Sequence, residues 1–406
     1  MESKEETINF SKYIIYILNS AKQILSFIKN LKNLSLINKK VCFCLFSFII
    51  LFIIYQPKEI NLKQKFKNEI LFLKSCLENT TIEFFEKYEN PKLSIVIPLF
   101  NNEKYLNRLL KSIQKQKIKE IEIIFVDDAS TDKSFQIIEN YKSIDKRIKI
   151  FRNLQNKGSL YTYVRCILEA NANYTMIIDA DDMLLSNLKE LYELSVKNNK
   201  DINDFGYIYG NIDKFIEIKM GNRELNQPYI GEMIFSNRYR GCTYITKKIM
   251  KSEIIKNAVK SIKEEFLNSK IILHADTLIF ICIFYHSKSY KSFNRMFSQI
   301  YMSNNESTSN NIVDNYNELF RVSIYLVKYI SELKYASKKY FNSHIEKAIS
   351  ILNWPINLCD NRKLIVNWDM LNEVINKILN NKDLNNNNKN EIYKLFDLIK
   401  QKTKNR

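Results

Sequence analysis

Glycine is scarce in this sequence, with six glycines in 406 residues. Neither a Gly-x-Gly-x-x-Gly loop nor a Gly-Lys-Ser/Thr loop is present. Dinucleotide-binding folds and ordinary NTPases use such glycine-rich loops to hold phosphates, so both classes are disfavoured. The seven cysteines are scattered singly apart from Cys42 and Cys44, and they show no metal-ligand or redox spacing.

Acidic residues are outnumbered by basic ones, and the formal net charge is +18. The lysines are spread along the chain, and no zinc-finger spacing, basic-region helix or aromatic RNA-binding motif accompanies them. A spread positive charge favours anionic membrane surfaces or phosphorylated ligands at least as much as nucleic acid. We therefore expect no nucleic-acid partner. A hydrophobic content of 46% predicts a folded chain, long enough for one large or two ordinary domains.

The N-terminal tail, residues 1–40, alternates apolar and basic positions at helical spacing. This pattern is typical of a helix lying on a membrane surface, although a coiled coil or a plain surface helix fits it nearly as well. The next run, Val41–Tyr55, is uncharged and strongly apolar. With Gln56 and Pro57 added it is long enough for a thin membrane, so we predict a transmembrane anchor at 41–57.

A cleaved signal sequence and a buried core helix explain this run less well. It begins far from Met1, and a soluble core helix does not need every face to be apolar. A charged helical stem is expected at 58–90, where Asn79 matches the glycosylation pattern. A short tail, one anchor and a large C-terminal part favour a single-pass type II protein of the ER or Golgi. Lysines flank both sides of the anchor, so a cytosol-facing orientation stays open.

The pattern changes at Pro91, where short apolar runs begin to alternate with helical patterns. This alternation predicts an α/β fold with a doubly wound, mostly parallel sheet and flanking helices. The expected strands are Leu93–Pro98, Ile121–Val126, Ile148–Phe151 and Tyr174–Ile178.

Carboxylates gather where two of these strands end. Asp127 and Asp128 follow the second strand, and Asp179, Asp181 and Asp182 follow the fourth. Ligands of open α/β sheets bind outside the carboxyl ends of the strands, and crowded carboxylates suit a hard cation such as Mg²⁺ or Mn²⁺. Taken alone, Asp179–Asp182 also fits a solvated acidic turn that caps the next helix.

Four motifs in order carry a family resemblance: SIVIPLFNNEKYLNRLLKSIQKQ, IEIIFVDDASTDKS, NKGS and YTMIIDADDML. Together they resemble glycosyltransferase family 2, whose members have the GT-A fold and invert the transferred sugar. The resemblance is close over Leu93–Asn198 and loose over Gly206–Ser309. It implies a hexosyltransferase that takes a nucleotide-sugar donor, often a UDP-sugar, with Mn²⁺ or Mg²⁺ as cofactor. The acceptor class, a glycan, lipid or protein, stays open.

The resemblance also implies site residues. Pro98 with the following loop, and Asp127 or Asp128, would contact the nucleotide base. Asp179 would contact the ribose or the metal, and Asp181 would be the metal ligand of the Asp-x-Asp motif. Lys157 and Arg165 would make further contacts with the donor. Many relatives carry an arginine where this chain has Tyr163, and Arg165 is the nearby basic residue. A missing donor contact would favour the alternative function, a catalytically degenerate GT-A fold that binds a nucleotide sugar or a partner.

Asp276 is the candidate catalytic base. It opens an apolar helix where the family carries the carboxylate that takes the acceptor's proton. An Asp at a helix N-terminus is also favoured by the helix dipole alone, so both interpretations stand for the residue by itself. His286 fits a structural role better than a metal ligand.

Further strands are expected at Gly206–Gly210 and Gly241–Thr246, within a catalytic domain at 91–310. Residues 311–406 should form a helical C-terminal extension, with a low-complexity loop at Asn380–Asn390.

Overall fold

The computed structural model describes residues 84–210, 215–218, 221–226, 244–272, 275–302, 316–332, 338–358 and 364–404, all within the unit Glu69–Arg406. The predicted tail, the predicted anchor at 41–57, Asn79 and nearly all of the stem lie outside these residues. Among the helices that the structure does describe, none is long and apolar enough to cross a membrane.

The strands and helices alternate through the first half of the described chain, as the sequence pattern predicts. The strands are β1 (Leu93–Leu99), β2 (Ile121–Asp127), β3 (Ile148–Arg152), β4 (Tyr174–Ile177), β5 (Met183–Leu184), β6 (Ile202–Gly210), β7 (Phe215–Ile218), β8 (Arg223–Asn226), β9 (Lys248–Lys251) and β10 (Ser289–Met302). The helices are α3 (Glu103–Gln114), α4 (Ser134–Ile144), α5 (Ser159–Glu169), α6 (Leu188–Asn198), α8 (Ser252–Lys260), α9 (Glu264–Leu267), α10 (Ala275–His286), α11 (Tyr316–Glu332), α12 (Lys338–Leu358), α13 (Trp368–Leu379) and α14 (Asn386–Lys404).

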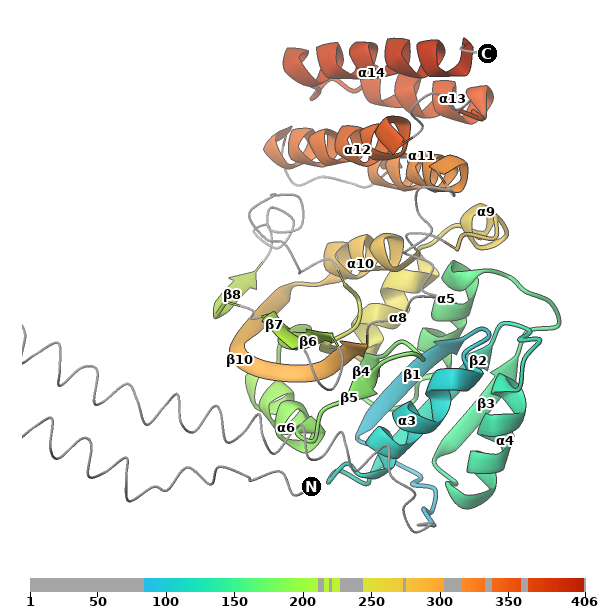
Figure 1. The fold of residues 1–406 in the computed structure, drawn as a ribbon. Helices are drawn as coiled ribbons and strands as arrows, with labels where there is room; N and C mark the ends of the chain where they lie inside the picture. Colours follow the sequence, from blue (N-terminus) through green and yellow to red (C-terminus); the bar gives the residue numbers. More distant parts are fainter. Residues whose placement is uncertain are drawn as a thin grey trace, which may run out of the picture. The chain divides into compact units, whose positions relative to one another are not determined.

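The described strands form one mixed sheet in the order β3-β2-β1-β4-β9-β6-β10-β5, with β7 on β6 and β8 on β10 (Figure 1). Strands β3, β2, β1 and β4 are parallel, as predicted. The prediction of a mostly parallel sheet also holds for β10, which runs parallel to β6. The sheet is nevertheless mixed, because β9 runs antiparallel to both β4 and β6. Likewise β7 follows β6 after residues 211–214, and so short a connection joins only antiparallel neighbours.

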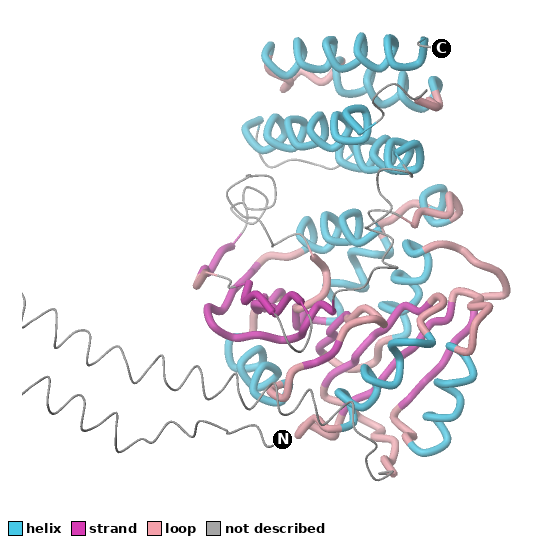
Figure 2. The backbone as a smooth tube through the Cα atoms, in the orientation of Figure 1, coloured by secondary structure: helices cyan, strands magenta, loops and turns pink. Residues whose placement is uncertain are grey.

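Helices cover both faces of the sheet, which is the doubly wound arrangement (Figure 2). Side chains alternate between the faces along β1. Ile95 and Ile97 join the core under α3, α4 and α6, whereas Val96 joins the core shared with α5, α8 and α10. The apolar positions that recur at helical spacing along α3 are all buried: Leu106, Leu109, Leu110 and Ile113.

One sequence-based expectation about local structure was wrong over its described part. The strand expected at Gly241–Thr246 begins only at Lys248, although residues 241–243 lie outside the described chain. Ser130 lies in the loop before α4, which begins at Ser134. Its hydroxyl accepts a hydrogen bond from the main-chain N–H of Asn101 at 3.0 Å.

The described elements from Tyr316 onward are all helices, as expected for the C-terminal extension. Helices α11–α14 share one continuous hydrophobic core with α8 and α10. The buried Lys328 of α11 lies 3.4 Å from Glu265 of α9 and 3.3 Å from Glu373 of α13, so it links the extension to the sheet domain. The extension therefore packs on the helices behind the sheet.

Candidate active site

The carboxyl ends of β1, β2 and β4 lie side by side because the three strands are parallel neighbours. Asp127 is the last residue of β2, and Asp179 lies two residues beyond the end of β4. The structure therefore brings both predicted groups of carboxylates to one edge of the sheet, where α/β folds bind their ligands.

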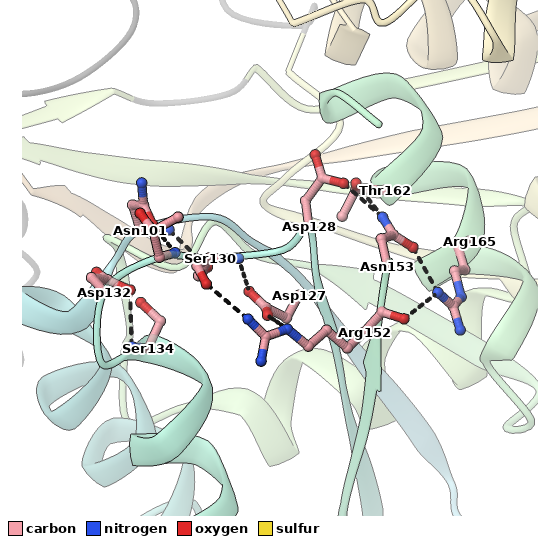
Figure 3. A network of polar contacts seen from close by, with 11 residues as sticks. Asn101, Asp127, Asp128, Ser130, Asp132, Ser134, Arg152, Asn153, Thr162 and Arg165 are labelled. Carbon is pink, nitrogen blue, oxygen red and sulfur yellow. Dashed lines mark hydrogen bonds and ion pairs between the residues drawn. The ribbon is translucent and has the colours of Figure 1, made fainter. Parts of the chain in front are cut away.

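The loops that follow β1 and β2 are joined by hydrogen bonds (Figure 3). Asn101 accepts a hydrogen bond from the Thr131 N–H at 2.9 Å through its side-chain oxygen. The Ser134 hydroxyl accepts one from the Asn102 N–H at 2.8 Å. Asn101 has a φ of 52°, a conformation that asparagine tolerates better than most residues. The half-buried Pro98 leads into this rigid pair of loops, which the resemblance assigns to the nucleotide base.

The buried carboxylate of Asp127 has partners on its own strand end and on β3. Its Oδ2 lies 3.0 Å from Nε of Arg152, and its Oδ1 accepts a hydrogen bond from the Ser130 N–H at 3.1 Å. Arg152 also donates to the Ser130 carbonyl at 2.9 Å (Figure 3). The contact of Asp127 with a nucleotide base stays a prediction.

Asp128 holds the turn that contains Lys157. Its carboxylate accepts hydrogen bonds from the main-chain N–H groups of Lys157 at 2.8 Å and Gly158 at 2.9 Å, and from the Asn153 amide at 2.7 Å. Gly158 has a φ of 89°, which L residues rarely adopt. Asp128 thus organises the backbone of the donor-side turn, and its contact with a base is likewise untested. The Lys157 ammonium lies 5.9 Å from the ring centre of Tyr161.

Tyr163 and Arg165 point in different directions from α5. Residues two positions apart on a helix lie about 200° apart around its axis. Arg165 donates to the Asn153 side-chain oxygen at 2.6 Å and to the Arg152 carbonyl at 3.1 Å. The Tyr163 hydroxyl donates to Oδ1 of Asp179 at 2.5 Å. Arg165 therefore supports Asn153. Tyr163 is the α5 residue that reaches the acidic segment, Asp179–Asp182.

Two other carboxylates affect the pKa of the half-buried Asp179. Its pKa is raised to about 7, chiefly because burial disfavours the ionised form and then because of the negative charge of Asp181. The hydrogen bond from Tyr163 acts in the opposite direction, and Asp276 adds a further raising charge. Asp181 and Asp276 therefore both lie within electrostatic reach of Asp179, although Asp276 comes from a distant helix.

Arg108 of α3 reaches the same segment and was missed by the sequence analysis. Its guanidinium donates to the main-chain carbonyl of Asp181 and lies 4.6 Å from the ring centre of Tyr105. Burial lowers the pKa of Arg108, while the charges of Asp181 and Asp182 oppose that shift. No spacing rule marks Arg108, because it stands between two buried leucines on a helix whose polar positions look alike.

Asp276 is the second residue of α10, and His286 is its last. One oxygen of the half-buried Asp276 carboxylate accepts a hydrogen bond from the Thr277 N–H at 2.8 Å. His286 Nδ1 lies 2.9 Å from the Cys282 carbonyl, one turn back in the helix. At 1.5 Å of rise per residue, roughly 15 Å separates the two ends of such a helix. The position of His286 fits the structural role.

The acidic segment suits a cation that the substrate helps to bind. No group of three or more His, Cys, Asp or Glu side chains among the described residues is arranged to hold a metal, and His274 lies outside them. Mg²⁺ and similar ions are commonly held by one or two carboxylates plus substrate phosphates. The pKa of Asp179 is raised chiefly by burial and then by the charge of Asp181, so the ionised form of this carboxylate would gain from a nearby cation. The donor set of Asp179 and Asp181 therefore fits a divalent ion completed by a diphosphate.

Comparison with known proteins gives a family match for part of the chain. Residues 94–258 match the model of glycosyl transferase family 2. A GalNAc(5)-diNAcBac-PP-undecaprenol beta-1,3-glucosyltransferase of Campylobacter jejuni is 34% identical over 122 residues, 30% of this chain and 38% of that protein. A cholesterol galactosyltransferase of Borreliella burgdorferi is 33% identical over 153 residues, 36% of this chain and 41% of that protein.

The chain spans about two fifths of the length of the curated relatives it matches. The crystal structure of S. aureus TarS 1–349 in complex with UDP-GlcNAc has a similar fold, with a TM-score of 0.57. The two sequences are 15% identical, and the structural similarity covers 77% of this chain and 89% of the TarS chain. These similarities support a transferase with a glycosyltransferase family 2 region and a GT-A-like mixed α/β sheet.

Proposed function

We propose, for a chain whose residues 94–258 match glycosyltransferase family 2, that the protein transfers a sugar from a nucleotide-diphosphate donor to an acceptor hydroxyl with inversion. One arrangement supports this proposal. Asp179 lies two residues beyond β4, Asp276 is the second residue of α10, and the two are near enough for the charge of Asp276 to act on the Asp179 carboxylate together with that of Asp181. A base candidate and a metal-binding candidate of one site need such proximity.

The chemistry follows from the positions of these side chains. Asp276 accepts the proton of the acceptor hydroxyl as its oxygen forms a bond to the anomeric carbon. The bond from that carbon to the diphosphate breaks on the opposite side, so the configuration inverts. Asp179 and Asp181 would hold a divalent ion, which as a Lewis acid stabilises the charge that develops on the leaving diphosphate. The loops at 98–103 and 127–134 would hold the base.

Calorimetry on the full-length chain in detergent tests the donor. UDP and GDP are titrated with and without Mn²⁺, UDP first because the S. aureus structure of similar fold holds UDP-GlcNAc. We expect Mn²⁺-dependent binding of one nucleotide, lost in Asp181→Ala. Absence of binding to every nucleotide would overturn the proposal.

Hydrolysis of the donor separates an enzyme from the alternative, a degenerate fold that only binds. An active glycosyltransferase leaks sugar slowly to water, so we expect metal-dependent release of free sugar from a UDP-sugar. Binding without any release of sugar would favour the binding module. The support for that alternative is Tyr163, which stands where many relatives of similar sequence carry an arginine.

The membrane assignment rests on the apolar run at 41–57 and is part of this proposal. A single-pass type II protein would place its C-terminal part in the lumen of the ER or Golgi, where it meets a glycan, lipid or protein acceptor. Glycan occupancy of Asn79 or Asn305 would support that orientation, and a protease-accessible C-terminal part in intact microsomes would contradict it.

A further inference from the structure

The contact between Tyr163 and Asp179 is built from both sides. The ring of Tyr163 packs against the core that α5 shares with α8 and α10, so the side chain is held in place by its apolar part. Its hydroxyl then reaches Oδ1 of Asp179 at 2.5 Å. A phenol hydrogen bond to a carboxylate is charge-assisted and directional, so it restricts how the carboxylate turns.

The tyrosine hydroxyl is a hydrogen-bond donor that carries no charge. An arginine or lysine in the same place would neutralise Asp179 and compete with any cation that binds there. The phenol orients the carboxylate and leaves its negative charge available. Side chains that hold a metal ligand by a hydrogen bond are part of how proteins tune a metal site.

We propose that Tyr163 is a positioning residue that orients Asp179 for a divalent cation: the hydroxyl occupies Oδ1 and presents Oδ2 to the ion. The proposal rests on the proposed function, because it assumes that Asp179 meets the metal of a nucleotide-sugar donor. The sequence analysis treated Tyr163 only as the loss of an arginine that contacts the donor. The proposal gives the tyrosine a role of its own.

The first test removes only the hydroxyl. Tyr163→Phe keeps the packed ring, and Tyr161→Phe, on the same helix, is the matched control. Mn²⁺ affinity is measured on the full-length protein in detergent by electron paramagnetic resonance, first without nucleotide and then with UDP. We expect the Mn²⁺ dissociation constant of Tyr163→Phe to rise about 10-fold or more, the range typical for loss of such a supporting hydrogen bond. Tyr161→Phe should bind Mn²⁺ as the unmodified protein does.

The second test asks for a split between metal affinity and turnover. In Tyr163→Phe, the Mn²⁺ concentration that gives half-maximal release of sugar from a UDP-sugar should rise by a larger factor than the one by which the maximal rate falls. A general structural defect would lower the maximal rate without this selective change in the Mn²⁺ requirement. In Tyr163→Arg, a guanidinium beside Asp179 should weaken Mn²⁺ binding further while raising the affinity for UDP in the absence of metal.

The outcomes separate the two proposals. Mn²⁺ affinity equal in the unmodified protein and in Tyr163→Phe would overturn the role of Tyr163 and leave the function standing. Failure of the unmodified protein to bind Mn²⁺ with any nucleotide would overturn the proposed function itself.

Discussion

The carboxylate of Asp128 accepts a hydrogen bond from the main-chain N–H of Gly158 at 2.9 Å. The other side of this turn touches the segment before α10, since the Leu160 N–H donates to the Ile271 carbonyl at 3.1 Å. Ile271 precedes Asp276 by five residues. The donor-side turn and the segment that leads to the candidate base therefore share one support at the N-terminus of α5.

Substitution of Gly158 by alanine should disturb this support. A Cβ at Gly158 would lie 2.8 Å from the Ile271 carbonyl oxygen, and the φ of 89° disfavours any L residue. We expect Gly158→Ala to lower the free energy of unfolding by about 1–3 kcal/mol, the usual cost of such backbone strain. Urea denaturation measures the loss. Gly221→Ala is the control, because the nearest atom to its added Cβ would be a side-chain nitrogen of Arg223 at 3.6 Å. An equal loss in both variants would contradict the strain argument.

Replacement of Asp276 by asparagine should separate binding from transfer. The amide keeps the size of the side chain but cannot take the acceptor's proton, so transfer should fall by about 10²–10⁴-fold. Nucleotide binding with Mn²⁺ should persist. Product formation and calorimetry on the same preparation measure both.

The control for this variant addresses the helix-dipole interpretation. Asp369 is the second residue of α13, as Asp276 is of α10, and it is exposed. Asp369→Asn should leave transfer unchanged. Full transfer by Asp276→Asn would show that another group acts as the base.

The parallel half of the fold could be predicted because its signals are local. Apolar runs bounded by turn residues marked β1, β2, β3 and β4 to within one or two residues. The spacing of leucines likewise marked the buried face of α3. Parallel neighbours place their carboxyl ends together, so the meeting of Asp127 and Asp179 at one edge followed from sequence.

Contacts that depend on how helices approach the sheet could not be predicted. Arg165 was assigned to the donor on its charge, yet its direction on α5 takes it to Asn153. Tyr163 reaches Asp179 and Arg108 reaches the Asp181 carbonyl only because two helices from opposite faces pass the end of β4. No residue spacing encodes that approach.

Composition also misled the analysis at the asparagine run. The loop expected at Asn380–Asn390 ends at Asn385, where α14 begins at the next residue. The Asn385 side chain accepts a hydrogen bond from the Asn388 N–H at 2.7 Å, which is the capping role asparagine favours. The Asn388 amide is buried and donates to the Asn342 carbonyl at 3.0 Å. A low-complexity run therefore contains a helix start and a packed contact.

The raised pKa of Asp179 predicts how stability depends on pH without metal. The unfolded chain loses this proton near pH 3.9 and the folded protein near 7, so the folded state binds more protons between these values. Stability should therefore fall as pH rises from about 4 to about 7. Asp179→Asn removes the cost of ionisation. Three pKa units at about 1.4 kcal/mol each give an expected stabilisation of up to about 4 kcal/mol at pH 8, and of about 1 kcal/mol at pH 4.5.

Urea unfolding at both pH values measures this difference. Asp132→Asn is a control of opposite sign. Burial acts to raise the pKa of Asp132, but hydrogen bonds from Ser134 and Glu103 bring it below the usual value. Loss of that carboxylate should destabilise the protein at pH 8. An Asp179→Asn variant less stable than the unmodified protein at pH 8 would show that burial does not strain this carboxylate.

Arg108 should matter for both the stability and the nucleotide affinity of the acidic segment. Its guanidinium holds the Asp181 carbonyl and offsets the charges of Asp181 and Asp182. Arg108→Gln should cost about 1.5–3 kcal/mol of unfolding free energy, the value of a hydrogen bond to a charged group. Nucleotide affinity at saturating Mn²⁺ should fall about tenfold, which corresponds to roughly 1.4 kcal/mol of lost attraction for the diphosphate.

Lys111→Gln removes the same charge from the last turn of α3 and should change neither quantity by as much. Equal effects in the two variants would mean that net charge, and not the contact with Asp181, determines the result.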